Sequence, residues 1–131
     1  MALAPASRPG PRAGQPLTND TLLAPARRVD VPTYDRAVLT PAIVHLGVGG
    51  FHRAHQAVYL DDLARRGVTA WGEVGVGLHH RDMKDALAPQ DCLYTVVARD
   101  GHDEARVVGA MVHYLFAPAS RTRSPTRGRA L

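Results

Sequence analysis

The pattern of apolar and polar positions is most regular between residues 42 and 67. Residues 43–46 (Ile-Val-His-Leu) are mainly apolar and β-branched, which predicts a short buried parallel strand. Glycines interrupt this run at positions 47, 49 and 50. Over residues 52–66 apolar side chains then recur at helical spacing, and Gly67 suits the left-handed residue that follows a helix. A strand, a glycine turn and a helix in this order predict the first half of a βαβ unit.

The remaining pattern predicts further strands and helices around this unit. In chain order we expect a short helix within 17–28, extended chain over 31–36, a second strand over 71–78, a helix over 80–88, a third strand over 92–98, a turn at Asp100-Gly101, and a hairpin partner over 105–112 whose apolar stretch is extended by 114–116. The predicted fold class is α/β, with a partial Rossmann-type sheet that is doubly wound, mostly parallel, incomplete and accompanied by a β-hairpin.

The net charge of +4 comes from the two ends of the chain. Residues 1–16 and 119–131 contain six arginines and no acidic residue; removing them leaves 10 basic and 12 acidic residues over 17–118, a net charge of −2. The body of the chain is therefore not a basic, nucleic-acid-binding surface. The single cysteine excludes an internal disulfide, and no apolar run is long enough to span a membrane, so we expect a cytoplasmic protein with no membrane partner.

Composition divides the 131 residues into three parts. Residues 1–16 contain four prolines and are expected to be a disordered leader; a mitochondrial presequence is the alternative, but prolines break the amphipathic helix it needs. Residues 17–118 are expected to form the N-terminal part of a nucleotide-binding domain. Residues 119–131 are a basic tail with no apolar pattern. This tail is interpreted either as a nucleic-acid-binding arm or, preferably, as the product of a shifted reading frame.

The glycine turn is the candidate binding site. Glycines let backbone N–H groups approach a phosphate, and the following helix dipole favours an anion, so this geometry predicts a dinucleotide site. His52 stands where the usual fingerprint has its third glycine, and we expect it to push the helix off the sheet or to turn toward the ligand. The alternative is a tight turn in an α/β domain that binds no nucleotide. The predicted cofactor-binding residues here are Ile43, Val44, His45, Leu46, Gly47, Val48, Gly49, Gly50, Phe51, His52, Arg53 and Ala54.

Asp82 is the candidate partner for the adenosine ribose hydroxyls, because it follows the second strand. A helix N-cap is the alternative role for this carboxylate. NAD is the favoured cofactor. Arg81 beside Asp82 suits a 2′-phosphate, so NADP stays open. His52 and His55 at i, i+3 lack a third ligand, and we assign no metal site. Cys92 is interpreted as a core residue.

Three segments resemble the mannitol dehydrogenase family, the long-chain polyol dehydrogenases that include mannitol 2-dehydrogenase and fructuronate and tagaturonate reductases. They are residues 43–56 (Ile-Val-His-Leu-Gly-Val-Gly-Gly-Phe-His-Arg-Ala-His-Gln), residues 71–78 (Trp-Gly-Glu-Val-Gly-Val-Gly-Leu) and residues 85–94. The Gly-x-Gly-Gly-Phe-His-Arg-Ala-His string is specific to that family and includes His52. The resemblance also matches Asp82 to the family's cofactor-selecting aspartate, although members often carry an acid where this chain has Arg81.

The resemblance implies a metal-independent, NAD-dependent oxidation of a secondary alcohol such as mannitol, or the reverse reduction. It also implies a catalytic lysine, with an asparagine and a histidine, on a helical C-terminal domain. Lys84 does not match that motif, so no catalytic residue is assigned. We therefore expect the cofactor-binding part of an oxidoreductase, without turnover of its own and marginally stable alone. The alternatives are a binding module whose basic tail contacts nucleic acid, and a methyltransferase-like domain.

Overall fold

The computed structural model describes residues 16–23, 26 and 28–118. The leader up to residue 15 and the basic tail 119–131 lie outside the described residues, so the interpretations of both stay predictions. The elements in chain order are η2 (Arg36–Val38), β1 (Pro41–Leu46), α1 (Gly50–Ala54), α2 (Gln56–Arg65), β2 (Gly72–Gly77), α3 (Asp82–Leu87), η3 (Ala88–Gln90), β3 (Tyr94–Arg99), β4 (Asp103–Val108) and β5 (Met111–Phe116). Among the described residues no helix is long and apolar enough to cross a membrane.

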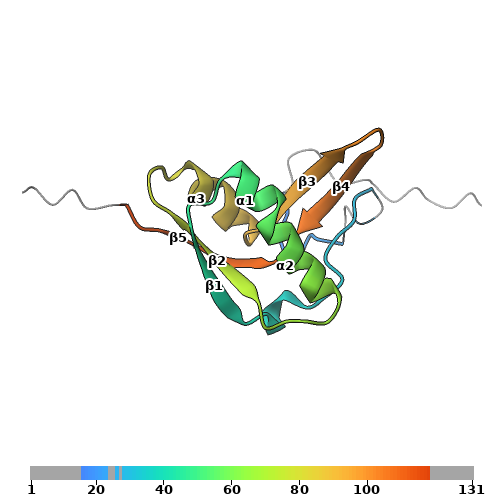
Figure 1. Cartoon of the computed structure of the whole chain (residues 1–131), viewed down its shortest axis with the longest axis horizontal. Helices are drawn as coiled ribbons and strands as arrows, with labels where there is room; N and C mark the ends of the chain where they lie inside the picture. The colour runs from blue at the N-terminus through green and yellow to red at the C-terminus, as the bar shows by residue number, and fades with distance from the viewer. Residues whose placement is uncertain (1–15, 24–25, 27, 119–131) are drawn as a thin grey trace, which may run out of the picture.

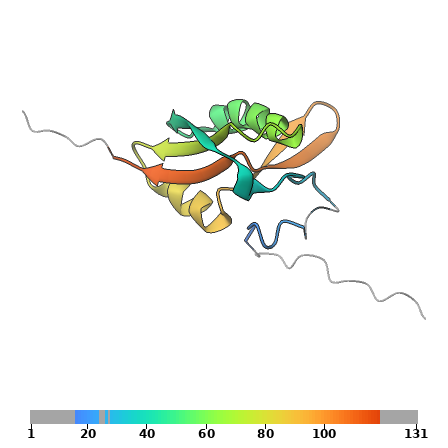
Figure 2. The same cartoon turned by 90° about the horizontal axis from the view of Figure 1, so that it is seen from below.

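The core of the fold is a parallel sheet with the strand order β1-β2-β5. The helices lie on the upper side of this sheet in Figure 1, and Figure 2 shows the β3–β4 hairpin extending beyond its end. A crossover through α1 and α2 connects β1 to β2, as a βαβ unit requires. The prediction of a partial Rossmann-type, mostly parallel sheet with a β-hairpin is confirmed.

The predicted hairpin is confirmed: the segment expected as the third strand forms β3 and pairs antiparallel with β4, in a two-stranded sheet of its own. The expected extent of the hairpin partner was wrong. The partner ends at Val108, and residues 111–116 form β5, which pairs parallel with β2. Gly109 lies at this break, where a side chain would come within 2.9 Å of Pro32 and 3.0 Å of Tyr34. The close packing at Gly109 separates two strands that the sequence pattern joins.

The third strand also begins later than expected, at Tyr94. Asp91 and Cys92 both have positive φ angles, 50° and 61°, so the backbone is left-handed where the pattern suggested a strand. Few non-glycine residues adopt this conformation, and two in succession form a sharp corner after η3. Cys92 itself is buried, which confirms its interpretation as a core residue.

The helix predicted over 52–66 is present but interrupted. It begins two residues earlier, at Gly50, and breaks at His55, whose φ and ψ of −125° and −80° are not helical. Its C-terminus is as predicted: Gly67 has a φ of 87°, its N–H donates to the carbonyl of Ala64, and the next residue bonds to Leu63. The short helix expected within 17–28 is instead a turn in the described residues 16–23.

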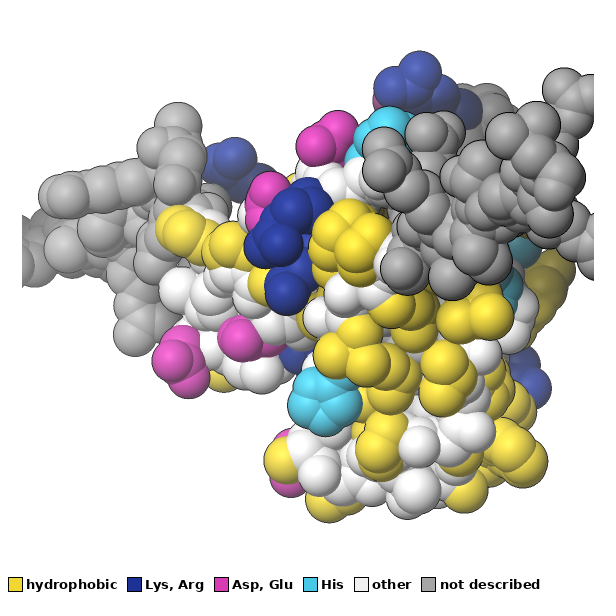
Figure 3. Space-filling view, turned by 90° about the vertical axis from the view of Figure 1, so that its left-hand side faces the viewer, with side chains coloured by type: hydrophobic (Ala, Val, Ile, Leu, Met, Phe, Trp, Pro, Cys, Tyr) yellow, Lys and Arg dark blue, Asp and Glu magenta, His cyan; other side chains and the backbone are white. Residues whose placement is uncertain are grey.

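Within the described residues the helices cover one face of the sheet only (Figures 1 and 2). Ala57, Leu87 and Met111 belong to the main hydrophobic cluster, which packs between the helices and the strands. On β1 the alternate residues Val44 and Leu46 are 64% and 65% exposed. Figure 3 shows hydrophobic side chains gathered at the end of the molecule where the strands finish. A bare apolar sheet face favours self-association. The expected marginal stability of the isolated chain stays a prediction.

Candidate functional site

The glycine turn joins the carboxyl end of β1 to the first turn of α1. Gly47 has a φ of 89°, and its N–H donates to the carbonyl of Val76 at 2.8 Å, which closes the β1–β2 ladder. Gly49 is the N-cap of α1 and supplies no side-chain hydrogen bond. The N–H groups of Gly50, Phe51 and His52 have no partner in the part of the chain that the structure describes. They are free to donate to an anion.

Two of these glycines have no structural reason to be glycine. A side chain at Gly49 or Gly50 would meet nothing within 4 Å, and neither residue has a positive φ. The other described glycines either have a positive φ or lie against other atoms. At Gly75, for example, a side chain would come within 2.7 Å of Val48. The open space at Gly49 and Gly50 therefore suits the close approach of a ligand to the backbone.

The side chains around the turn point in different directions. Phe51 is 79% exposed and stacks on His55 with ring centroids 4.1 Å apart. The Arg53 guanidinium lies 5.8 Å from the centre of the Tyr94 ring, and its Nε donates to the carbonyl of Gly49 at 3.3 Å. Val48 is buried in the core. The backbone, and not a set of converging side chains, therefore dominates this site.

His52 is buried, so the expectation that its side chain turns toward a ligand is wrong. Its Nε2 lies 2.7 Å from Oε1 of Glu73, and its ring stacks on that of His45 at 3.7 Å. Burial raises the pKa of Glu73 to about 7. Burial, followed by the nearby His45 and Arg53, lowers the pKa of His52 to about 4. The sequence pattern gave no sign of Glu73, because it occupies an ordinary inward-facing position of β2.

Asp82 begins α3, which follows the carboxyl end of β2. Since β1 and β2 are parallel, Asp82 and the glycine turn lie at the same end of the sheet. The alternative role as an N-cap is wrong: Arg81 is the N-cap, and Asp82 is exposed in the first turn. The Arg81 guanidinium lies 5.4 Å from the centre of the Phe116 ring.

The histidines do not form a metal site in the described part of the chain, where no group of three potential ligands occurs. His55 is exposed and its Nδ1 lies 2.8 Å from the carbonyl oxygen of Phe51, whereas His52 faces the interior. His79 and His80 are exposed in the loop after β2.

A cavity of about 770 Å³ lies elsewhere, between the N-terminal segment and η3. Arg36 lines it and donates to the carbonyls of Gly109, Asp91 and Met111. Its guanidinium is thus bound to the protein's own backbone. This cavity therefore offers less to a charged ligand than the glycine turn does.

Comparison with known proteins identifies the family. Residues 41–123 match the family model described as "Mannitol dehydrogenase Rossmann domain". The chain belongs to the mannitol dehydrogenase family. This match covers the glycine turn and Asp82, and it confirms the resemblance found in the sequence.

Individual members of the mannitol dehydrogenase family agree with this assignment. The chain is 53% identical over 103 residues to mannitol 2-dehydrogenase of Aspergillus niger, covering 75% of this chain and 21% of the relative. It is 56% identical over 94 residues to that of Cereibacter sphaeroides, covering 68% and 20%. The chain thus spans about a fifth of the length of the curated relatives it matches.

Solved structures show the same likeness. The fold superposes on Pseudomonas fluorescens mannitol 2-dehydrogenase, in a ternary complex with NAD and D-mannitol, with a TM-score of 0.72 and 40% identity over 78% of this chain and 22% of that chain. For a D-sorbitol dehydrogenase in substrate-free form the values are 0.69 and 36%, with the same coverage. The described chain therefore corresponds to part of a dehydrogenase Rossmann domain.

Proposed function

We propose that this chain is the cofactor-binding part of an NAD-dependent polyol or sugar-acid dehydrogenase. The observation that carries the proposal is the glycine turn, where Gly49 and Gly50 leave open space beside three backbone N–H groups that have no partner among the described residues. A pyrophosphate fits such a turn because it is anionic and accepts several hydrogen bonds. The related enzyme from Pseudomonas fluorescens was solved with NAD, which favours NAD as the cofactor here.

The proposed site consists of residues 43–54 and Asp82. The N–H groups at the start of α1 hold the pyrophosphate, and Asp82 accepts hydrogen bonds from the adenosine ribose. Residues 17–118 form this cofactor-binding unit, which we place in the cytoplasm. The cofactor, when bound, supplies a hydride acceptor for the carbon of a secondary alcohol. The chain's own residues bind and orient it.

The catalytic base is not among the residues that we assign. Lys84 is the single lysine of the sequence, and it lies on α3 with no hydrogen bond or ion pair among the described residues. We therefore expect the purified chain, incubated with mannitol and NAD, to give no reduced cofactor by absorbance. Turnover that scales with the concentration of the chain would contradict this proposal.

Asp82 is expected to set the preference for NAD. Replacing Asp82 with alanine removes a carboxylate acceptor for the ribose, so we expect NAD to bind about 10- to 100-fold more weakly, the equivalent of one or two charge-assisted hydrogen bonds. Affinity for NADP should change little, because Arg81 remains available for the 2′-phosphate. Fluorescence titrations with both cofactors measure the two affinities.

Asp85→Ala is the matched control, since Asp85 is also exposed in the first turn of α3. It should keep the affinity and preference of the unchanged chain. An Asp82→Ala variant with an unaltered ratio of NAD to NADP affinity would show that Asp82 does not contact the ribose.

A further inference from the structure

A carboxyl group is buried directly behind the first turn of α1. The side chain of Glu73 is fully buried in β2, and that of His52 is 5% exposed. Their closest atoms, Oε1 and Nε2, are 2.7 Å apart, and within the described residues no side-chain nitrogen or oxygen of either residue forms a hydrogen bond. No lysine or arginine forms an ion pair with Glu73 in that part of the chain. An ionised carboxylate in this position would be uncompensated, which is costly.

The surroundings of the pair contain little that would stabilise a negative charge. Besides burial, His45 on β1 and Arg53 on α1 lower the pKa of His52. Besides burial, Glu73 raises the pKa of Tyr94 on β3. Burial raises the pKa of Tyr94, so its hydroxyl stays neutral. On the β5 side Glu73 pairs with Met111, and Asp61 on α2 is engaged by its own hydrogen bonds. The pair therefore holds one proton at mildly acidic pH and loses it near neutral pH.

His52 connects this pair to the glycine turn. Its side chain contacts Glu73, while its backbone N–H is one of the three unpaired donors at the start of α1. A negative charge on Glu73 lies behind the helical turn that begins at the proposed pyrophosphate site, so this charge and the pyrophosphate repel each other. In a poorly solvated environment this repulsion is weakly screened.

We propose that Glu73 and His52 are positioning residues that share one proton, and that the dinucleotide binds tightly only while the pair keeps it. This inference rests on the proposed function, because it concerns the same site. Linkage makes the effect reciprocal: a deprotonated pair weakens cofactor binding, and cofactor binding makes the pair take up a proton.

The first test is the pH dependence of NAD affinity, measured by calorimetry on the full chain. Between pH of about 6 and about 8.5 we expect affinity to fall about tenfold, a typical coupling strength. Two buffers of different ionisation enthalpy should reveal proton uptake on binding at neutral pH. Glu73→Gln has the same shape without the charge, so it should bind NAD with nearly constant affinity over this range.

His113→Gln is the control, since His113 is exposed on β5 and should leave the pH dependence unchanged. NAD that binds with equal affinity at both pH values would overturn the proton coupling while leaving the proposed function intact. NAD that fails to bind at any pH would overturn the proposed function and the coupling together.

A second measurement requires no cofactor. In NMR spectra of the free chain, the ring and amide signals of His52 should titrate near neutral pH, and this step should be absent from Glu73→Gln at an unchanged circular dichroism spectrum. His52 signals that stay constant from about pH 5 to about pH 9 would overturn the shared proton, whether or not NAD binds.

Discussion

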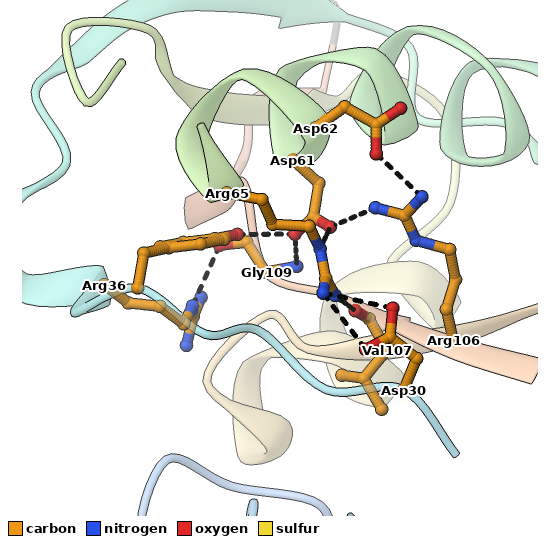
Figure 4. Close-up of polar contacts among 9 residues, drawn as sticks. Asp30, Arg36, Asp61, Asp62, Arg65, Arg106, Val107 and Gly109 are labelled. Atoms are coloured by element: carbon orange, nitrogen blue, oxygen red, sulfur yellow. Dashed lines mark hydrogen bonds and ion pairs between the residues drawn. The ribbon is translucent and has the colours of Figure 1, made fainter. Parts of the chain in front are cut away.

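Replacing Asp61 with alanine is expected to lower the free energy of unfolding by about 3–5 kcal/mol. Asp61 lies on α2 with a fully buried side chain, and it accepts hydrogen bonds from Arg65 at 2.7 Å, the N–H of Gly109 at 2.8 Å, Tyr34 and Arg106. Figure 4 shows Arg65, Arg106 and Gly109 converging on the Asp61 carboxylate. Tyr34 donates to the same carboxylate from the N-terminal segment. Removing one partner from a buried charged network costs about 3–5 kcal/mol, while a small domain has only about 5–15 kcal/mol of stability in total.

The same network predicts an acid-sensitive fold. Burial alone would raise the pKa of Asp61, but the hydrogen bonds from Arg65, Tyr34, Gly109 and Arg106 outweigh it and hold the pKa below its ordinary value. A carboxylate with a lowered pKa stabilises the fold above its unfolded pKa and loses that contribution as pH falls through the folded pKa. The unchanged chain should therefore be more stable than Asp61→Ala at neutral pH. This difference in the free energy of unfolding should disappear only in strong acid.

Urea unfolding followed by circular dichroism measures the difference. The matched control is Asp62→Ala: Asp62 is the next residue, is half-exposed, and pairs with Arg106 at 2.8 Å. Such an exposed pair contributes about 0–1 kcal/mol, so the control should unfold at nearly the same urea concentration as the unchanged chain. Equal unfolding midpoints for Asp61→Ala and Asp62→Ala would show that Asp61 does not hold α2 to β4 and the N-terminal segment.

Replacing Gly49 with valine should weaken cofactor binding strongly and leave the fold intact. The backbone of Gly49 is extended, with φ and ψ of −91° and 178°, and a Cβ atom there would have no other atom of the described chain within 4 Å. A valine is therefore tolerated by the protein, but its side chain fills the space that the proposed pyrophosphate occupies. We expect a loss of NAD affinity of about 100-fold, equivalent to about 2.7 kcal/mol.

Ala70→Val is the control for this change, because Ala70 is exposed in the loop before β2, outside the proposed site. Both variants should show the circular dichroism spectrum and unfolding midpoint of the unchanged chain. If Gly49→Val binds NAD as tightly as Ala70→Val does, the ligand does not approach the backbone at this turn.

The elements that were predicted correctly are specified by residues close to one another in the sequence. The strand, glycine turn and helix at residues 43–67 are each specified by local periodicity, and Gly67 by the left-handed conformation that follows a helix. The same pattern predicted the fold class and the glycine turn as the candidate site, and the family string then added the family. Local pattern was sufficient here because each signal falls within a single turn or strand.

The features that the sequence pattern did not predict depend on contacts between distant parts of the chain. The break at Gly109 reflects the approach of Pro32 and Tyr34, so nothing in the run from Ala105 to Val112 indicates that it divides into two strands of different partners. The inward orientation of His52 likewise depends on Glu73, which comes from β2. Asp61 looks like an ordinary helical acid until tertiary structure brings its donors together.

The most direct test of the proposed site is an NMR titration of the labelled chain with NAD. We predict that the amide signals of Gly49, Gly50, Phe51 and His52 shift in a saturable way, with Asp82 as a second affected position. Signals of the β3–β4 hairpin should not move. A folded chain whose turn amides stay unchanged at saturating NAD, or whose shifts fall only elsewhere, would contradict the assignment of the glycine turn as the cofactor site.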